Sequence, residues 1–249
     1  MSQNQSNILK VTVGIVTFNA AKTLESTLQS IVNQTYRNIE IVVIDGGSTD
    51  GTQSILTKYD EVIHYWHSKK DKGIYDAMNM VTTYSQGDFL IFLGCDDTFY
   101  TPTVIEEFVA QAQADSRKVY YGDVFFLGDQ RRYDGVFSSY KLALRGLSHQ
   151  SIFYPKHLYK KEQYNLKYRY WADYYLNILL WGNYGAFQRI ELIVANFNQD
   201  GQGSINVDQP FLDDKLNHVF KSLGILPALL VFLQRIKQKI FGNRMTLLK

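Results

Sequence analysis

A chain of 249 residues is long enough for one large domain with its own core, and its 45 % hydrophobic and 20 % charged residues are ordinary for a globular protein. Six of the 26 basic residues and no acidic one lie between Leu216 and Lys249, so a net-negative body precedes a basic tail, which argues against a general nucleic-acid-binding protein. The single Cys95 excludes an intramolecular disulfide, and the polar N-terminus and the lack of an apolar run of roughly 18 residues favour a cytoplasmic protein without a transmembrane helix.

Short apolar segments alternate with helical patterns through the first half of the chain. Buried strands are predicted at 11–18, 40–44, 62–67 and 89–93. Helices are predicted between them at 21–33, 53–59 and 74–85. Strands that are apolar on both faces and alternate with helices predict an α/β fold with a parallel, helix-covered sheet.

Polar side chains follow three of these strands. Asn19 comes after the first strand, Asp45 after the second, and Asp96 and Asp97 after the fourth. Parallel strands end at one edge of a sheet, and ligands bind beyond that edge. We therefore expect these side chains to meet in a ligand site.

The second half of the chain has a different composition and a different pattern of predicted elements. Strands are predicted at 119–127 and 132–137, Tyr and Phe become frequent, and an apolar helix begins near Asp173 and runs to about Trp181. Neither an internal repeat nor a Pro/Gly-rich linker separates the halves. One domain of two halves is therefore expected, rather than two domains.

The adjacent pair Asp96–Asp97 is a candidate metal site. Two carboxylates at a strand end repel each other unless a cation or water neutralises them, and Mg²⁺ or Mn²⁺ prefers such oxygen ligands together with phosphate. A turn or helix cap before Thr98 is the structural alternative, because Asp is common at such positions.

Two loops carry further polar groups. The loop 45–52 has no Lys and is not a phosphate loop, but Asp45 could accept hydrogen bonds from a base or ribose; a connecting turn is the alternative. In the segment 71–79, Lys72 could meet a phosphate, although a solvated helix N-terminus would look similar.

In chain order, four segments carry a resemblance to a known family: VTVGIVTFN (11–19), IDGGSTDGT (44–52), DKGIYDAMN (71–79) and GDFLIFLGCDD (87–97). This ordered set resembles the inverting, non-processive family 2 glycosyltransferases of the GT-A fold, over roughly residues 11–190. The resemblance implies a single Rossmann-like α/β domain with a mostly parallel central sheet. It also implies transfer of a sugar from a nucleotide-diphosphate sugar to a hydroxyl of a glycan or lipid-linked acceptor.

The resemblance also assigns roles to individual residues. The nucleotide and its sugar would lie against Thr17, Phe18, Asn19, Asp45, Lys72, Gly73 and Asp96. Asp97 would hold a divalent metal, Mn²⁺ or Mg²⁺, on the diphosphate. Asp173 would be the general base for the acceptor hydroxyl, with a helix cap as its structural alternative. The acceptor would contact His149, Gln150 and Asp123. Asp123 is also a second candidate for the base, and a structural contact is its other alternative.

Three positions depart from the family pattern. Gly46 stands where many relatives have a second acid, so the preference of this chain for a particular nucleotide base is open. Cys95 replaces a more usual Ser, Ala or Asn, and is expected to pack rather than react. The Q-x-x-R-W motif of processive synthases does not occur, which favours addition of a single sugar.

The predicted domain is residues 1–220, with a nucleotide-sugar half at about 8–118 and an acceptor half at about 119–220. A basic amphipathic tail is predicted at 221–249, where the apolar stretch 223–233 precedes Arg235, Lys237 and Lys239. The apolar stretch is too short to span a bilayer, and an interfacial helix on the inner face of the membrane, with its cations toward anionic headgroups, fits the tail. Packing on the body or on another subunit is the alternative.

Two other functions share some of these features. A nucleotidyltransferase would be expected to carry a Gly-rich, Arg/Lys-bearing loop after its first strand, and TFNAAKT (17–23) lacks it. A catalytically silent nucleotide-sugar-binding scaffold would not need Asp45, Asp97 and Asp173 together. Metal-dependent donor turnover discriminates between these hypotheses.

Overall fold

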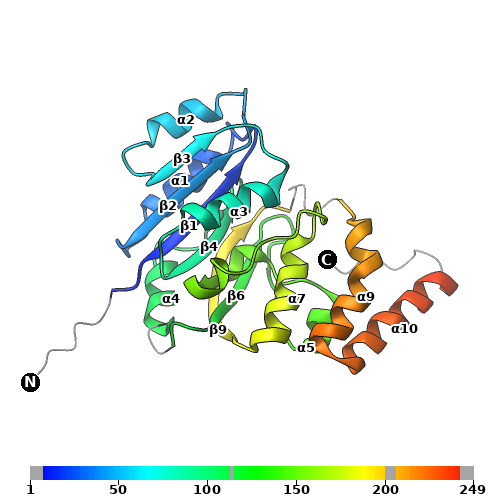
Figure 1. Cartoon of the computed structure of the whole chain (residues 1–249). Coiled ribbons are helices and arrows are strands. Elements are labelled where there is room, and N and C mark those ends of the chain that lie inside the picture. The colour runs from blue at the N-terminus through cyan, green and yellow to red at the C-terminus, as the bar shows by residue number, and fades with distance from the viewer. Residues whose placement is uncertain (1–7, 113–114, 200–205, 242–249) are drawn as a thin grey trace, which may run out of the picture.

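The computed structural model describes residues 8–112, 115–199 and 206–241. Its first half is a parallel sheet with the strand order β3-β2-β1-β4. These strands are β1 (Val11–Thr17), β2 (Ile39–Asp45), β3 (Tyr65–Ser68) and β4 (Phe89–Gly94). The helices of this half are α1 (Leu24–Val32), α2 (Thr52–Lys58), α3 (Ile74–Tyr84) and α4 (Val104–Ala112). The predicted α/β fold with a mostly parallel sheet is confirmed (Figure 1).

The second half extends the same sheet with mixed strand directions. Its strands are β5 (Thr98–Phe99), β6 (Val119–Phe126), β7 (Arg131–Tyr133), β8 (Ile152–Pro155) and β9 (Phe187–Phe197). β8 pairs antiparallel with both β4 and β6, and so joins the two halves, while β9 runs parallel to β6. The strand predicted at 132–137 is only the short β7, because the chain turns at Asp134 and Gly135, both with positive φ.

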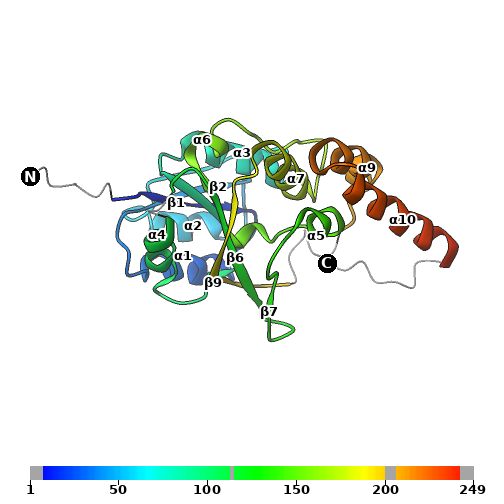
Figure 2. The ribbon, with the colours of Figure 1, turned by 90° about the horizontal axis from the view of Figure 1, so that it is seen from below.

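Helices cover both faces of the sheet. Helices α1 and α4 lie on one side of the sheet and α3 on the other (Figure 2). The side chains of α1, α2 and α4 pack in one core with Val11, Val13 and Ile15, while those of α3 pack with Val42 and Ile44. The second core also contains α7 (Ala172–Tyr184), α9 (Gln209–Leu223) and α10 (Ile225–Phe241). The short helices α5 (Ser139–Leu144) and α6 (Lys156–Tyr159) and the 3-10 turn η1 (His149–Ser151) complete the second half.

Two contacts place α9 beside α7. A side chain at Gly182 in α7 would collide with the backbone of Ser222 in α9, so glycine permits the close approach of the two helices. At the other end of α9, the buried Asp208 caps the helix by accepting from the Phe211 N–H, and it also accepts from the N–H groups of Tyr170 and Trp171 just before α7. The start of α7 is thereby fixed.

The C-terminal helix α10 packs against α9 and α5 by one side only. Ala228 and Val231 are buried, whereas apolar side chains along the opposite side are exposed. Every helix in the described parts of the chain is too short or too polar to span a bilayer.

Candidate active site

A large cleft opens where the carboxyl ends of β1 and β4 face the second half of the chain. Its volume is about 1690 Å³, and its walls also include η1, the start of α7, α9 and α10. A pocket for one small molecule typically has about 300–1,000 Å³. This cleft therefore has room for two substrates side by side.

The end of β1 forms one wall of the cleft. Thr17, Phe18 and Asn19 all line it, as their predicted contact with a nucleotide requires, and the Phe18 ring is 63 % exposed. Asn19 adopts a left-handed backbone conformation (φ 51°), which Asn tolerates better than most residues. Its side-chain oxygen accepts from the Thr49 N–H at 3.0 Å, and its own N–H donates to Ser48 Oγ at 2.7 Å. The β1 turn is therefore tied to the loop after β2.

Asp45 is fully buried at the end of β2 and lies outside the set of described residues that line the cleft. Its Oδ2 accepts from the N–H groups of Gly47 (3.2 Å) and Ser48 (2.9 Å) and from Ser68 Oγ (2.5 Å), and its Oδ1 accepts from Ser48 Oγ. In this structure the Asp45 carboxylate organises the loop that holds Asn19. Its contact with a base or ribose stays a prediction.

The segment before α3 contributes Lys70, Asp71 and Gly73 to the cleft, whereas Lys72, predicted to meet the donor, is absent from the described lining. The Lys72 N–H donates to Asp76 Oδ2 at 3.0 Å. The Asp71 carboxylate lies next to Gly46, where a side chain would come within 2.9 Å of Asp71 Oδ2. The absence of a side chain at Gly46 thus leaves space for the carboxylate of Asp71.

Asp96 and Asp97 lie together on the cleft wall after β4. Asp97 is 1 % exposed; its Oδ1 accepts from the Asn198 N–H at 2.8 Å and its Oδ2 from Gln150 Nε2 at 3.0 Å. Burial, and next the charge of Asp96, raise the pKa of Asp97 to about 6. Each Asp97 oxygen keeps a free lone pair, since a carboxylate has about four acceptor sites. Two adjacent carboxylates on the cleft wall, one of them with a raised pKa, fit a divalent cation.

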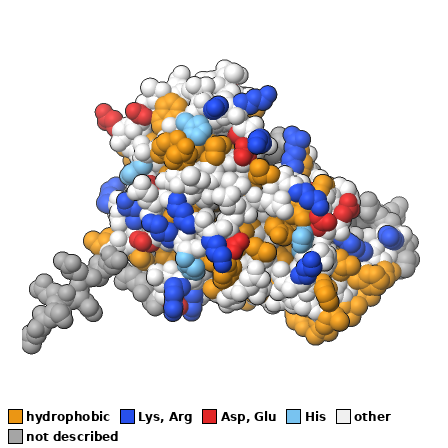
Figure 3. Space-filling view, viewed as in Figure 1, with side chains coloured by type: hydrophobic (Ala, Val, Ile, Leu, Met, Phe, Trp, Pro, Cys, Tyr) orange, Lys and Arg blue, Asp and Glu red, His pale blue; other side chains and the backbone are white. Residues whose placement is uncertain are grey.

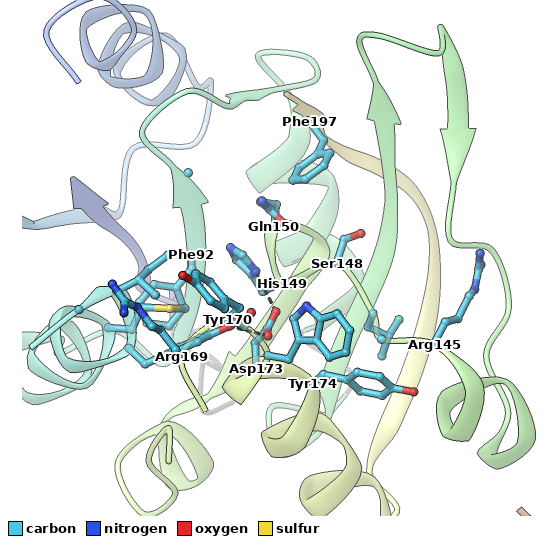
Figure 4. Close-up of a pocket in the computed structure, with 18 of the residues that line it drawn as sticks. Phe92, Arg145, Ser148, His149, Gln150, Arg169, Tyr170, Asp173, Tyr174 and Phe197 are labelled. Carbon is cyan, nitrogen blue, oxygen red and sulfur yellow. Dashed lines mark hydrogen bonds and ion pairs between the residues drawn. The ribbon is translucent and has the colours of Figure 1, made fainter. Parts of the chain in front are cut away.

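Asp173 lies in the first turn of α7, beneath the loop that carries His149 (Figure 4). Trp171, and not Asp173, holds the N-cap position of α7, so Asp173 is not the helix cap that was its structural alternative. His149 Nδ1 lies 3.1 Å from Asp173 Oδ2, and the Tyr75 hydroxyl lies 2.7 Å from both Asp173 Oδ1 and the Tyr170 carbonyl oxygen. The carboxylate is thus held in one orientation while its side chain remains 16 % exposed to the cleft.

The turn η1 links the two acidic sites. Of its consecutive residues, His149 contacts Asp173 and Gln150 contacts Asp97. Both were predicted to bind the acceptor; the structure places both on the cleft wall, where each contacts one of the two acids.

Asp123, the further candidate for acceptor contact, lies outside the described cleft lining. It is 1 % exposed on β6, forms ion pairs with Arg132 and, at 2.8 Å, with Arg189, and accepts from the Gly135 N–H at 2.6 Å. These partners match the structural alternative. Cys95, whose thiol has its pKa raised to about 11 chiefly by burial, has a packing environment as expected.

The sequence pattern did not identify several residues that line the cleft on its second-half side. The cleft is also lined by Arg145, Arg169, Tyr170, Trp171, Tyr174, Lys215 and Arg235. The run of aromatic residues before Asp173 was a usable signal, because aromatic rings commonly line ligand pockets. The cations of α9 and α10 had no such signal, since only packing turns them toward the cleft.

The mostly parallel sheet flanked by helices is consistent with a glycosyltransferase of the GT-A type, and comparison with known proteins agrees. Residues 12–173 match the sequence model of glycosyl transferase family 2. The chain is 33 % identical over 241 residues to a PGL/p-HBAD biosynthesis glycosyltransferase of Mycobacterium bovis and to one of Mycobacterium tuberculosis, covering 94 % of this chain and 93 % of each relative. The chain therefore belongs to family 2 of the glycosyltransferases.

Solved structures share the fold at low sequence identity. S. aureus TarS 1-349 in complex with UDP-GlcNAc has a TM-score of 0.71 and 16 % identity, covering 95 % of this chain and 74 % of that one. Against a longer TarS structure, the chain spans 44 % of its length. A mannosyltransferase from Pyrobaculum calidifontis in complex with GDP-Man and Mn²⁺ has a TM-score of 0.60 and 14 % identity, covering 94 % and 81 %.

Proposed function

We propose that this glycosyltransferase transfers a sugar from a nucleotide-diphosphate sugar to an acceptor hydroxyl, with inversion at the anomeric carbon. The observation that carries the proposal is the pairing of two acidic sites in one cleft. Asp96 and Asp97 lie at the strand ends, Asp173 lies at the start of α7, and η1 contacts both sites. TarS and the mannosyltransferase, which share the fold, were each solved with a nucleotide sugar.

The donor would lie on the first half of the chain. Phe18 and Asn19 would contact the nucleotide, and Asp96 and Asp97 would face its diphosphate. Asp97 would hold Mn²⁺ or Mg²⁺, which when bound neutralises charge on the leaving diphosphate. Across residues 8–112, 115–199 and 206–241, no group of three or more His, Cys, Asp or Glu side chains could hold a metal. The remaining ligands would therefore be diphosphate oxygens and water, as is usual for Mg²⁺.

Asp173 would act on the acceptor. Its carboxylate would take the proton of the acceptor hydroxyl as that oxygen bonds to the anomeric carbon, and the bond to the diphosphate oxygen would break on the opposite side. The electron pair of the broken bond would leave with the nucleoside diphosphate, so the configuration inverts. His149 and Tyr75 would hold Asp173 in position, and Tyr170 and Trp171 would offer ring faces to the acceptor sugar.

The direct test is release of nucleoside diphosphate from UDP-, GDP- and dTDP-sugars, with Mn²⁺ or Mg²⁺ and with a chelator. We expect release from one donor, loss of that release in chelator, and an increase when a membrane extract supplies the acceptor. Metal-dependent binding of a nucleotide without release under any condition would favour a silent binder. No binding of any nucleotide would contradict the proposal.

We also propose that α10 attaches the enzyme to an anionic membrane surface. The exposed side of the helix is apolar; it comprises Ile225, Leu226, Leu229, Leu230, Phe232, Leu233 and Ile236. Figure 3 shows apolar side chains gathered in the region of α9 and α10. Lys237 follows Leu233 by four residues and Leu230 by seven, so it lies on this same side and supplies charge complementary to anionic headgroups. The helix would lie in the interface.

Vesicle sedimentation tests this attachment. We expect the double variant Leu229→Glu/Leu233→Glu to bind phosphatidylglycerol vesicles about tenfold or more weakly, because it loses apolar burial and adds repelled charge. Val62→Glu, an exposed apolar residue of the other half, is the matched control and should bind normally. Equal vesicle binding by the double variant, or concentration-dependent dimerisation of the wild type that the double variant abolishes, would assign α10 to protein contact.

A further inference from the structure

A buried lysine lines the cleft without an acidic partner. Lys215 in α9 is 7 % exposed, and among the described residues no carboxylate lies within ion-pair distance of it. Its Nζ donates to the Leu144 carbonyl oxygen at 3.2 Å and lies 4.9 Å from the centre of the Tyr174 ring. One carbonyl and one ring face satisfy an ammonium group only in part, because it has three donors and a full charge.

A second cation lies beside the first. Arg235 of α10 also lines the cleft, donates to the Leu212 carbonyl oxygen, and repels Lys215. Burial, and next the charge of Arg235, lower the pKa of Lys215 to about 8. Asp213 is a nearby acid on the cleft wall, but it is exposed and accepts from Gln209 Nε2 at 2.7 Å. Two cations held together without a carboxylate destabilise the folded chain unless an anion joins them.

The position of these cations assigns them to the acceptor rather than to the donor. They come from α9 and α10, whereas Asp96 and Asp97 follow β4 in the other half. Tyr174, on which Lys215 packs, directly follows Asp173 in α7. Lys215 donates to Leu144, the last residue of α5, and the chain leads from there to His149. Figure 4 shows Arg145, the residue after Leu144, on the opposite side of the cleft from Arg169. The pair therefore lines the part of the cleft bounded by α5 and α7, and α7 is the helix that carries the proposed base.

We propose that Lys215 and Arg235 form an anion subsite for a phosphate group on the acceptor, so that the acceptor is a phosphate-bearing glycan or glycolipid. This inference rests on the proposed function and names the substrate class of its second site. A guanidinium can bind two phosphate oxygens as a fork, and an ammonium can neutralise a third as a point charge. A neutral acceptor would leave both cations without a counter-ion.

The experiment compares glucose 6-phosphate with glucose as probes of the wild-type protein, by calorimetry in chelator so that the metal site does not contribute. We expect glucose 6-phosphate to bind about tenfold or more tightly than glucose, since charge-assisted hydrogen bonds are the stronger kind. Lys215→Met and Arg235→Gln should each remove most of that preference, and Arg235→Lys should keep part of it. Lys221→Met, an exposed lysine of the same helix, is the matched control and should retain it.

Two parallel measurements separate the possible sources of the anion. Metal-dependent nucleotide binding and binding to phosphatidylglycerol vesicles should be unchanged in Arg235→Gln, whose substitution leaves the buried lysine in place. Loss of nucleotide binding would assign the cations to the donor, and loss of vesicle binding alone would assign them to lipid headgroups; either result would overturn the subsite. Equal affinity of the wild type for glucose and glucose 6-phosphate, with nucleotide binding intact, would overturn the subsite alone. Absence of nucleotide binding would instead contradict the proposed function.

Discussion

Replacing Asp173 with Asn is expected to lower the rate of sugar transfer by about 10²–10⁴-fold, the range that general-base catalysis contributes. The amide is nearly the same size as the carboxylate and can still contact His149 and Tyr75, but it cannot take the proton of the acceptor hydroxyl. Donor binding should persist, because Asp173 lies on α7, away from β1 and β4. The measurements are single-turnover transfer and the nucleotide dissociation constant.

Asp60→Asn is the matched control for this variant. Asp60 is an exposed acid after α2 that accepts from the Trp66 indole and lies outside the described cleft lining. It should transfer sugar at the wild-type rate. Near-normal transfer by Asp173→Asn would remove Asp173 from the role of base, and loss of donor binding along with transfer would indicate a disturbed cleft instead.

Replacing Asp97 with Asn is expected to abolish metal-dependent binding of the donor. In the wild type that binding should weaken about tenfold for each pH unit below 6, because protonation of Asp97, whose pKa is raised to about 6, competes with the metal. Calorimetric titration of Mn²⁺ and nucleotide between pH 5 and 8 measures both effects. A flat pH profile, or metal-dependent donor binding that survives in Asp97→Asn, would contradict the assignment of Asp97 as a metal ligand.

The same substitution should stabilise the metal-free chain. A carboxyl whose pKa is raised on folding favours the folded state when protonated; this contribution is complete below the unfolded pKa of about 4 and is lost as the pH rises through about 6. At pH 8 the wild type therefore carries an unfavourable buried charge that Asn removes. Thermal unfolding in chelator should show a higher Tm for Asp97→Asn at pH 8 and a smaller difference at pH 4. A lower Tm at pH 8 would indicate that the Gln150 and Asn198 hydrogen bonds outweigh the buried charge.

Local pattern predicted the parallel half of the sheet with small errors at its ends. β1, β2 and β4 are apolar on both faces, so a run of consecutive apolar residues is enough to predict that each strand is buried. In the first half, α4 was not predicted. In the second half, the missed elements are β5, β8, β9, α5, α6 and α9. β8 is only four residues long, and its antiparallel pairing to β4 and β6 depends on residues distant along the chain.

The acidic residues of the site could be named from the chain, but their partners could not. Asp97 and Asp173 follow recognisable motifs, whereas the contacts from Gln150, Asn198 and Tyr75 bridge 53, 101 and 98 positions. For Asp45 and Asp123, the motif did not predict the partners that they have in this structure. Their motifs suggested ligand contacts, yet both are buried, and their hydrogen bonds and ion pairs are with other parts of the chain.

The α/β class and the order of the acidic residues could be predicted from the chain, because strand periodicity and motif order are properties of neighbouring residues, and four ordered motifs indicated the family by resemblance. Which side chains share the cleft depends on how distant segments pack. Lys215 and Arg235 look like ordinary residues of amphipathic helices until α9 packs on α7 and α10 packs on α9. That packing buries the lysine beside Tyr174 and Arg235 and away from any carboxylate partner among the described residues. Because these residues come from three different helices, a local sequence pattern could not predict that they lie together.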